Sequence, residues 1–202
     1  MKLYYSPGAC SLAPHIILRE TGSKFEAEKV DLKGKRTSSG ADYLRINPKG
    51  YVPALELDNG NILTEAGVII QYLADQKPDL SLVPKAGTME RYREMEWISF
   101  ISAEIHKTFA PLWKPNTPEE TRANQKTLLA DRFDYLVKQL EGKQYLMGEN
   151  FTVADAYLFT VVNWAAAFKF DLAPWPVLQT YMARVATRPA VVETLRAEGL
   201  AK

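Results

Sequence analysis

The chain has 202 residues, of which 24% are charged and 47% are hydrophobic, an ordinary globular composition. Its 25 basic and 24 acidic residues leave a net charge of +1, so a basic nucleic-acid-binding surface is not indicated. No apolar run approaches the roughly 20 residues that span a bilayer. One cysteine cannot form an internal disulfide, and two histidines are too few for most zinc sites. We therefore expect a cytoplasmic protein without metal, membrane or nucleic-acid partners.

The first 75 residues alternate short strand patterns with helical patterns. Compact apolar or alternating runs bounded by turn residues predict strands at Met1–Tyr5, Phe25–Leu32, Ala54–Leu57 and Ile62–Leu63. Helical spacing predicts helices at Ser11–Glu20 and Glu65–Asp75. The second of these helices is expected to bury Val68, Ile69, Tyr72 and Leu73. The dipeptide Asn59-Gly60 is typical of a hairpin turn and joins the last two strands.

Strand patterns disappear after Pro78–Ala86, a segment that proline interrupts twice. Helical patterns follow at Met89–Ala110, Glu119–Leu140, Val177–Ala186 and Ala190–Glu198. Thr152 and Asp155 match a capping box that opens one more helix, with Phe151 as its hydrophobic staple. We therefore expect an α/β unit at residues 1–80, a linker at 81–87 and an all-helical unit at 88–202.

Cys10 lies between the first predicted turn and the first predicted helix. The backbone N–H groups at a helix N-terminus carry partial positive charge and favour a thiolate, so a cysteine at this point is expected to be acidic and reactive. The alternative is a small buried apolar residue, which is common for a lone cysteine. Ser11, the next residue, could act as the N-cap of the helix or as an activating hydroxyl.

Val52-Pro53 opens a predicted strand. Proline can take the cis form in a tight turn, and the residue before it is pushed into extended geometry. The N–H and C=O of Val52 could therefore pair with an extended peptide, as an added strand would. The alternative is an ordinary proline at a strand start.

Glu65-Ala66 stands at the first turn of the second predicted helix. The N–H groups there can hold a carboxylate, and the Glu65 side chain can hold an ammonium. Together they could bind both ends of an amino-acid head group. The alternative for Glu65 is an acidic residue that interacts favourably with the helix dipole.

In this order, these motifs resemble the cytosolic glutathione transferases, and SPGACSLAPHIILRE, NPKGYVPALELDNG, ADAYLFT and RAEGL resemble their bacterial beta class. The resemblance covers essentially the whole chain. It implies an α/β, thioredoxin-like N-terminal domain followed by an all-helical C-terminal domain. It also implies a homodimer with one glutathione site in each subunit.

The resemblance assigns glutathione-binding roles to residues of the first domain. Cys10 matches the beta-class cysteine that faces the glutathione sulfur and can form a mixed disulfide with it. Val52-Pro53 matches the segment whose main chain pairs with the cysteinyl part of glutathione. Glu65-Ala66 matches the pair that binds the γ-glutamyl head, although many relatives have Ser or Gly in place of Ala66. Lys35 matches a basic residue that reaches the glycyl carboxylate, and its alternative is a solvated loop lysine.

In the second domain, Glu96–Lys107 resembles the family's first long helix. The resemblance adds five residues of this helix to the glutathione-binding set: Ser99, Ala103, Glu104, His106 and Lys107. Ser99, Ala103 and His106 are spaced to share one helical face. Ser99 stands where relatives often have Asn, and His106 matches the beta-class histidine near the glutathione sulfur. Glu104 is expected to reach across the dimer. No role is assigned to His15.

The resemblance implies an enzyme that conjugates glutathione to small hydrophobic electrophiles, with thiol-disulfide or peroxide reduction through Cys10. Glutathione is then a co-substrate, and no cofactor is bound permanently. Phe109 and Trp164 could line the electrophile pocket, or they could be core residues. The alternatives are a glutathione-dependent dehalogenase of aromatic degradation intermediates and a non-catalytic binding module of the same fold.

Overall fold

The computed structural model describes residues 1–201 and divides the chain into two compact units. One unit contains Met1–Val83 together with the chain from Thr187 onward, and the other contains Pro84–Ala186. The first boundary falls inside the linker expected at residues 81–87. The second differs from the expected division, because the chain from Thr187 onward, which contains the last helix, belongs to the first unit.

The first unit contains a five-stranded mixed sheet in the order β3-β2-β1-β4-β5. Its strands are β1 Lys2–Tyr5, β2 Glu26–Asp31, β3 Arg36–Thr37, β4 Ala54–Glu56 and β5 Ile62–Thr64. β1 is parallel to β2 and antiparallel to β4, and β4 forms the predicted hairpin with β5. The four predicted strands are confirmed. β3 was not predicted, because a two-residue strand carries no periodic signal.

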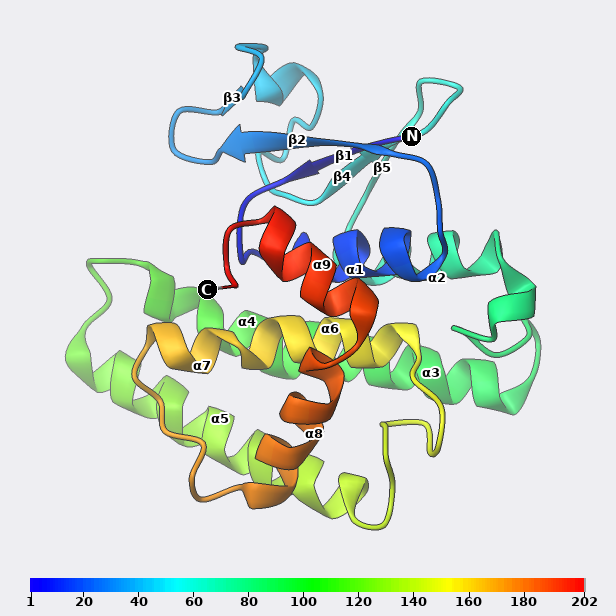
Figure 1. Ribbon diagram of the computed structural model, residues 1–202. Helices are drawn as coiled ribbons and strands as arrows, with labels where there is room; N and C mark the ends of the chain where they lie inside the picture. Colours follow the sequence, from blue (N-terminus) through cyan, green and yellow to red (C-terminus); the bar gives the residue numbers. More distant parts are fainter. Residues whose placement is uncertain (202) are drawn as a thin grey trace. The chain divides into compact units, whose positions relative to one another are not determined.

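Helices cover one side of this sheet (Figure 1). They are α1 Leu12–Glu20, α2 Ala66–Asp75 and α9 Pro189–Ala197, and two short 3₁₀ segments, η1 Tyr43–Arg45 and η2 Pro78–Leu80, lie in the connections. α1 packs against both α2 and α9. The predicted buried face of α2 is partly wrong, because Val68 is 47% exposed while Ile69, Ile70 and Leu73 are buried. The buried stripe follows the i, i+3, i+4 spacing from Ala66, and Val68 lies off that stripe.

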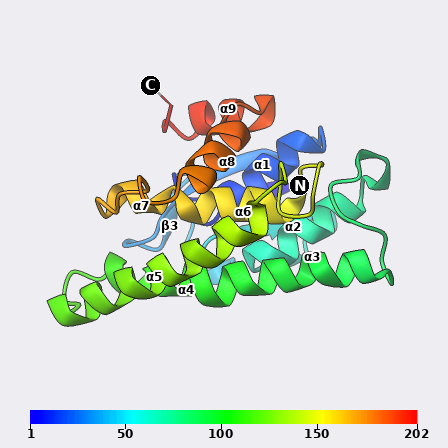
Figure 2. The same cartoon turned by 90° about the horizontal axis from the view of Figure 1, so that it is seen from below.

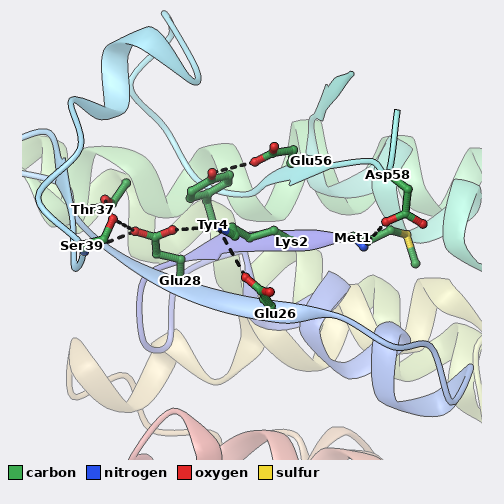
Figure 3. Close-up of polar contacts among 9 residues, drawn as sticks. All are labelled: Met1, Lys2, Tyr4, Glu26, Glu28, Thr37, Ser39, Glu56 and Asp58. Carbon is green, nitrogen blue, oxygen red and sulfur yellow. Dashed lines mark hydrogen bonds and ion pairs between the residues drawn. The ribbon is translucent and has the colours of Figure 1, made fainter. Parts of the chain in front are cut away.

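Polar side chains cover the opposite side of the sheet (Figure 3). The Lys2 ammonium lies 3.5 Å from the carboxylates of both Glu26 and Glu28. The hydroxyl of Tyr4 donates a hydrogen bond to Glu56 at 2.7 Å, and burial raises the pKa of Tyr4. The Tyr4 ring itself packs with Tyr43 and the neighbouring Val52. These polar groups are paired with one another.

The second unit is built of helices. They are α3 Met89–Phe100, η3 Ile101–His106, α4 Lys107–Phe109, η4 Ala110–Trp113, α5 Glu119–Leu140, α6 Val153–Val162, α7 Trp164–Ala167 and α8 Pro176–Ala186. Figure 2 shows α3 and α4 as parts of one continuous rod, as predicted for Met89–Ala110. Within this rod η3 is a π-helix, which the sequence analysis did not predict. A π-helical segment changes the direction of every later side chain relative to an ideal α-helix.

All ten residues of α6 are buried, and its N-terminus is fixed by acidic side chains. The predicted capping box of Thr152 and Asp155 is confirmed. The Asp155 carboxylate also accepts hydrogen bonds from the Leu146 N–H at 2.9 Å and the Tyr181 hydroxyl at 2.9 Å. Glu94 accepts the Ala154 N–H at 2.9 Å. Glu94 thus accepts one N–H of the first turn of α6, and Asp155 accepts the N–H of its N-cap residue, Thr152.

No helix within residues 1–201 is long and apolar enough to cross a membrane. The same residues include no cluster of three or more His, Cys, Asp and Glu side chains that could hold a metal ion.

Candidate functional site

Cys10 lies in the turn that joins β1 to α1. Hydrogen bonds from the Ala9 N–H to Ser6 and from the Leu12 N–H to Ala9 shape this turn. The Cys10 thiol donates to the carbonyl of Val52 at a sulfur–oxygen distance of 3.1 Å. Burial raises the pKa of Cys10 to about 12, and the nearby Glu65 charge adds to the rise. The backbone N–H groups of the turn lower the pKa, but by less. The predicted position is confirmed, whereas the raised pKa runs against the expectation of an acidic cysteine.

Ser11 is fully buried, and its hydroxyl is occupied locally. Its Oγ donates to the Ser6 carbonyl at 3.2 Å and accepts the Ser6 N–H at 3.1 Å. Ser11 occupies the N-cap position of α1, but its side chain makes no capping hydrogen bond. The Ser11 hydroxyl therefore closes the turn that carries Cys10 and does not act as an activating hydroxyl.

The Val52-Pro53 peptide bond is cis, and Val52 is buried in a small cluster with Tyr43 and Ala54. The carbonyl of the preceding Tyr51 accepts hydrogen bonds from the Tyr43 hydroxyl at 2.8 Å and from the Asn47 side chain at 2.7 Å. The Val52 N–H makes no hydrogen bond to any residue between 1 and 201. A fixed main-chain segment with an unused donor can pair with an extended peptide.

Glu65 is the N-cap residue of α2 and adopts a φ of 70°. This left-handed conformation is uncommon for a residue other than glycine, and such conformations concentrate at functional sites. The Glu65 side chain makes no capping hydrogen bond. Its carboxylate binds the Lys49 ammonium at 2.6 Å, and both side chains are more than half exposed. Lys49 also donates to Thr64 at 3.0 Å. The sequence analysis did not single out Lys49. Its only signal was the acidic Glu65, for which a basic partner could have been expected.

Ala66 is the first residue of α2 and is buried, so it contributes its backbone to the head-group region and exposes no side chain.

Lys35 is anchored and not a solvated loop residue. Its ammonium donates to the Gly50 carbonyl at 2.9 Å and lies 6.0 Å from the Tyr51 ring centroid. Within the first unit, Lys35 and Cys10 therefore both contact the segment that contains Val52.

The predicted residues of the second unit divide into two groups. Ser99, Ala103 and Lys107 are exposed, whereas His106 is half-buried. The prediction that Ser99, Ala103 and His106 share one face assumed an uninterrupted α-helix, and the spacing argument does not hold across the π-helix η3, which ends at His106. The Glu104 carboxylate accepts two hydrogen bonds from Arg132 of the same chain, at 3.0 and 2.7 Å. Glu104 therefore has an intramolecular partner.

His106 lies at the edge of an aromatic cluster. Its Nδ1 is 2.7 Å from the Tyr157 hydroxyl, and its ring packs edge-on against Trp164 at 4.9 Å between centroids. Phe109 and Trp164 are buried core residues, as one alternative held. The exposed member of the cluster is Trp113, at 53%, which packs against Phe168 at 4.6 Å. Sequence reasoning missed Trp113, whose only signal was an aromatic residue beside prolines.

His15 has a structural role that the sequence did not indicate. Its buried Nδ1 lies 2.8 Å from a carboxylate oxygen of Glu198, which follows α9. The other oxygen of Glu198 accepts the Gly8 N–H at 2.9 Å. Residues from near the end of the chain thus hold the turn that carries Cys10.

Comparisons with known proteins agree with this geometry. Family models described as the N-terminal and C-terminal domains of glutathione S-transferase match residues 1–75 and 100–189. The glutathione S-transferase GstA of Escherichia coli O157:H7 is 48% identical over 200 residues, which cover 99% of this chain and 100% of that one. A bacterial beta class glutathione S-transferase from Sphingomonas chungbukensis has a solved structure with 48% identity and a TM-score of 0.97. A sphingomonad glutathione S-transferase solved in complex with glutathione has 48% identity and a TM-score of 0.96. Both solved chains and this chain are covered in full.

The chain belongs to the glutathione S-transferase family. The expected fold, a thioredoxin-like unit followed by a helical unit, and the expected enzyme class are thereby confirmed. Within the family, the resemblance to the bacterial beta class is also confirmed.

Proposed function

We propose that this transferase conjugates glutathione to small hydrophobic electrophiles, with the peptide bound by the first unit and the electrophile by aromatic side chains of the second. The observation that carries the proposal is the contact between the exposed Glu65 carboxylate and the Lys49 ammonium. The backbone of Glu65 has a positive φ, which is uncommon for a residue other than glycine. The α-amino group of glutathione presents the same chemistry to the same carboxylate. The N–H groups of Ala66 and its neighbours at the start of α2 suit the adjacent α-carboxylate.

The cysteinyl part of glutathione is proposed to pair with the main chain of Val52. The unused Val52 N–H supports this pairing, but the Val52 carbonyl is occupied by the Cys10 thiol. A peptide N–H that takes the carbonyl would release the Cys10 S–H. Because the pKa of Cys10 is about 12, the released group is a neutral donor that can stabilise the glutathione thiolate.

The remaining sequence assignments complete the proposal. Lys35 binds the glycyl carboxylate, because its ammonium already lies beside the Gly50–Tyr51 backbone. His106 is proposed as a second donor to the glutathione sulfur. The hydroxyl of Tyr157 holds the His106 ring in one orientation, which supports this role. Lowering the thiol pKa is useful because a thiol with a pKa near 8.5 is only a few per cent ionised at pH 7.

Thiol-disulfide exchange through Cys10 is a second proposed activity. Cys10 is the only cysteine, so its mixed disulfide with glutathione must be resolved by a second glutathione molecule. The raised pKa of Cys10 disfavours this route. A cytoplasmic location is part of the proposal, because a free thiol and reduced glutathione both persist in a reducing compartment.

A homodimer is also proposed, and the surface of α3 supports it. Met89, Tyr92 and Met95 recur at intervals of three residues, and all three are exposed. An exposed apolar stripe of this kind marks an interaction surface. Light scattering of the purified protein tests the proposal, and a monomer at micromolar concentration would overturn it.

The function is tested by comparing two thiols in conjugation to 1-chloro-2,4-dinitrobenzene. Glutathione should react far above its spontaneous rate, whereas cysteinylglycine should react slowly because it lacks the γ-glutamyl group that Glu65 binds. Retention on immobilised glutathione checks binding without chemistry. Equal enhancement of both thiols would contradict the proposed head-group site, and binding without any conjugation would contradict the proposed reaction.

A further inference from the structure

The guanidinium of Arg122 binds three backbone carbonyl groups at once. Nε donates to Thr117 at 3.2 Å, Nη1 to Leu112 at 3.0 Å and Nη2 to Lys114 at 2.7 Å. Arg122 lies in the first turn of α5, and its three acceptors lie in the segment Leu112–Thr117 that leads into this helix. We call this segment the Trp113 loop, after the exposed indole that it carries.

The Trp113 loop depends on this guanidinium for much of its order. Outside η4, its other hydrogen bonds include two short turns, from the Lys114 N–H to Pro111 and from the Thr117 N–H to Lys114, and one bond from the Thr117 hydroxyl to the Pro111 carbonyl at 2.6 Å. Because helix ends leave carbonyl groups without partners, the carbonyls after η4 need an outside donor. A planar guanidinium presents several N–H groups in a fixed fork, which a lysine ammonium cannot reproduce.

Trp113 stands between two of the three clamped carbonyls. Its indole packs edge-on against Phe168 at 4.6 Å and against Trp164 at 5.9 Å between centroids. Trp164 in turn contacts His106. In Figure 2 the connection from α4 to α5 and the helix α7 lie at the same end of the second unit. Fixing the backbone on both sides of Trp113 therefore fixes an exposed aromatic ring at the edge of this cluster.

We infer that Arg122 is a positioning residue for electrophile recognition, acting through Trp113. The inference rests on the proposed function, in which the aromatic cluster beside His106 receives the electrophile. An electron-poor aryl ring gains from contact with an indole, whereas a small alkyl electrophile offers no ring to pack. Arg122 thus sets the preference of the enzyme for aromatic over alkyl electrophiles without contacting either.

The test is a double-mutant cycle between Arg122 and Trp113. The variants are Arg122→Met, Trp113→Ala and the double variant, assayed with 1-chloro-2,4-dinitrobenzene and with iodomethane. Arg122→Met should raise the KM for the aryl halide about fivefold and leave the KM for glutathione unchanged. It should have no further effect once Trp113 is alanine. Arg122→Lys should behave like Arg122→Met.

Arg184→Met is the matched control. Arg184 also donates to a backbone carbonyl in the second unit, that of Gln144 at 2.7 Å. Its replacement should leave the preference between the two electrophiles unchanged. Additive effects in the double variant, or a glutathione KM that rises as much as the aryl halide KM, would overturn the inference.

Acrylamide quenching of tryptophan fluorescence separates this inference from the proposed function. The difference in quenching between the parent and Trp113→Phe reports the indole of Trp113. That difference should grow in Arg122→Met, because the released loop exposes the ring. A wild-type chain that conjugates no electrophile overturns the proposed function and the specificity role with it. Unchanged quenching in Arg122→Met overturns the positioning by Arg122 alone.

Discussion

The thiol of Cys10 and the carbonyl of Val52, 42 positions apart in the sequence, form a hydrogen bond with a sulfur–oxygen distance of 3.1 Å. This bond requires Cys10 to keep its proton, and burial acts in the same direction. Cys10 is therefore held as a thiol, although it stands at the start of a helix.

The reactivity of Cys10 should follow its raised pKa. Alkylation by iodoacetamide should be slow at pH 7 and should keep rising up to about pH 12, because the thiolate is the reactive form. In concentrated guanidinium chloride the same cysteine should titrate near its ordinary value. Mass spectrometry measures both rates, and a plateau near neutral pH in the folded protein would contradict the assignment.

The variant Cys10→Ala should separate two activities. Conjugation of an activated aryl halide should largely survive, because its nucleophile is the sulfur of glutathione. Disulfide reductase activity should disappear, because no other cysteine can carry the mixed disulfide. In the wild type treated with oxidised glutathione, mass spectrometry should show one adduct, on Cys10. Surviving reductase activity in the variant would refute this division of roles.

Glu65→Ala should weaken glutathione binding by about 2 kcal/mol, or about 30-fold, because it leaves a bound ammonium without its partner. Isothermal calorimetry measures the change. Glu26→Ala is the matched control, because Glu26 is also an exposed carboxylate of the first unit with a lysine partner. An unchanged affinity in Glu65→Ala would remove Glu65 from the site.

Asp155→Ala should lower the free energy of unfolding by about 3 kcal/mol. A capping box alone predicts roughly 1 kcal/mol, but the buried carboxylate also binds Leu146 and Tyr181. Denaturant unfolding measures the loss, with Asp131→Ala as an exposed control. The glutathione affinity of the folded protein should not change in Asp155→Ala. An equally small loss of stability in both variants would contradict the structural role of Asp155.

Glu94 should make stability fall as pH rises from about 4.5 to about 7. Burial raises its pKa to about 7 in the folded chain, from an ordinary value of 4.5. Within this interval the folded state holds more protons than the unfolded state, so the free energy of unfolding decreases with pH. The loss should level off above pH 7. In Glu94→Gln, the free energy of unfolding should differ less between pH 5 and pH 8 than it does in the wild type. An equal difference in the two proteins would show that Glu94 does not titrate in this interval.

Features with local causes could be predicted from the sequence. The hairpin of β4 and β5 follows from Asn59-Gly60, and the start of α6 follows from Thr152 and Asp155. In both cases, the residues that determine the geometry lie within a few positions of one another. The resemblance to a known family supplied what local patterns could not, namely which of these segments bind glutathione.

Features with distant causes could not be predicted. The acidity of Cys10 depends on how deeply its sulfur is buried and on Val52, and neither is visible from the turn itself. The π-helical turn η3 ends in His106 inside an uninterrupted helical pattern, because packing and not periodicity selects it. The carbonyl groups that Arg122 binds become neighbours only after the loop has formed. Charge and burial are therefore the terms that sequence patterns represent least well.

The contact of Glu198 with His15 and Gly8 has a consequence for biosynthesis. A ribosome makes the chain from its N-terminus, and domains generally fold as units while synthesis proceeds. The first unit lacks α9 and Glu198 until every residue of the second unit has been translated. The unit that is begun first is therefore completed after the second, and only then can Glu198 accept the hydrogen bond of the turn that carries Cys10.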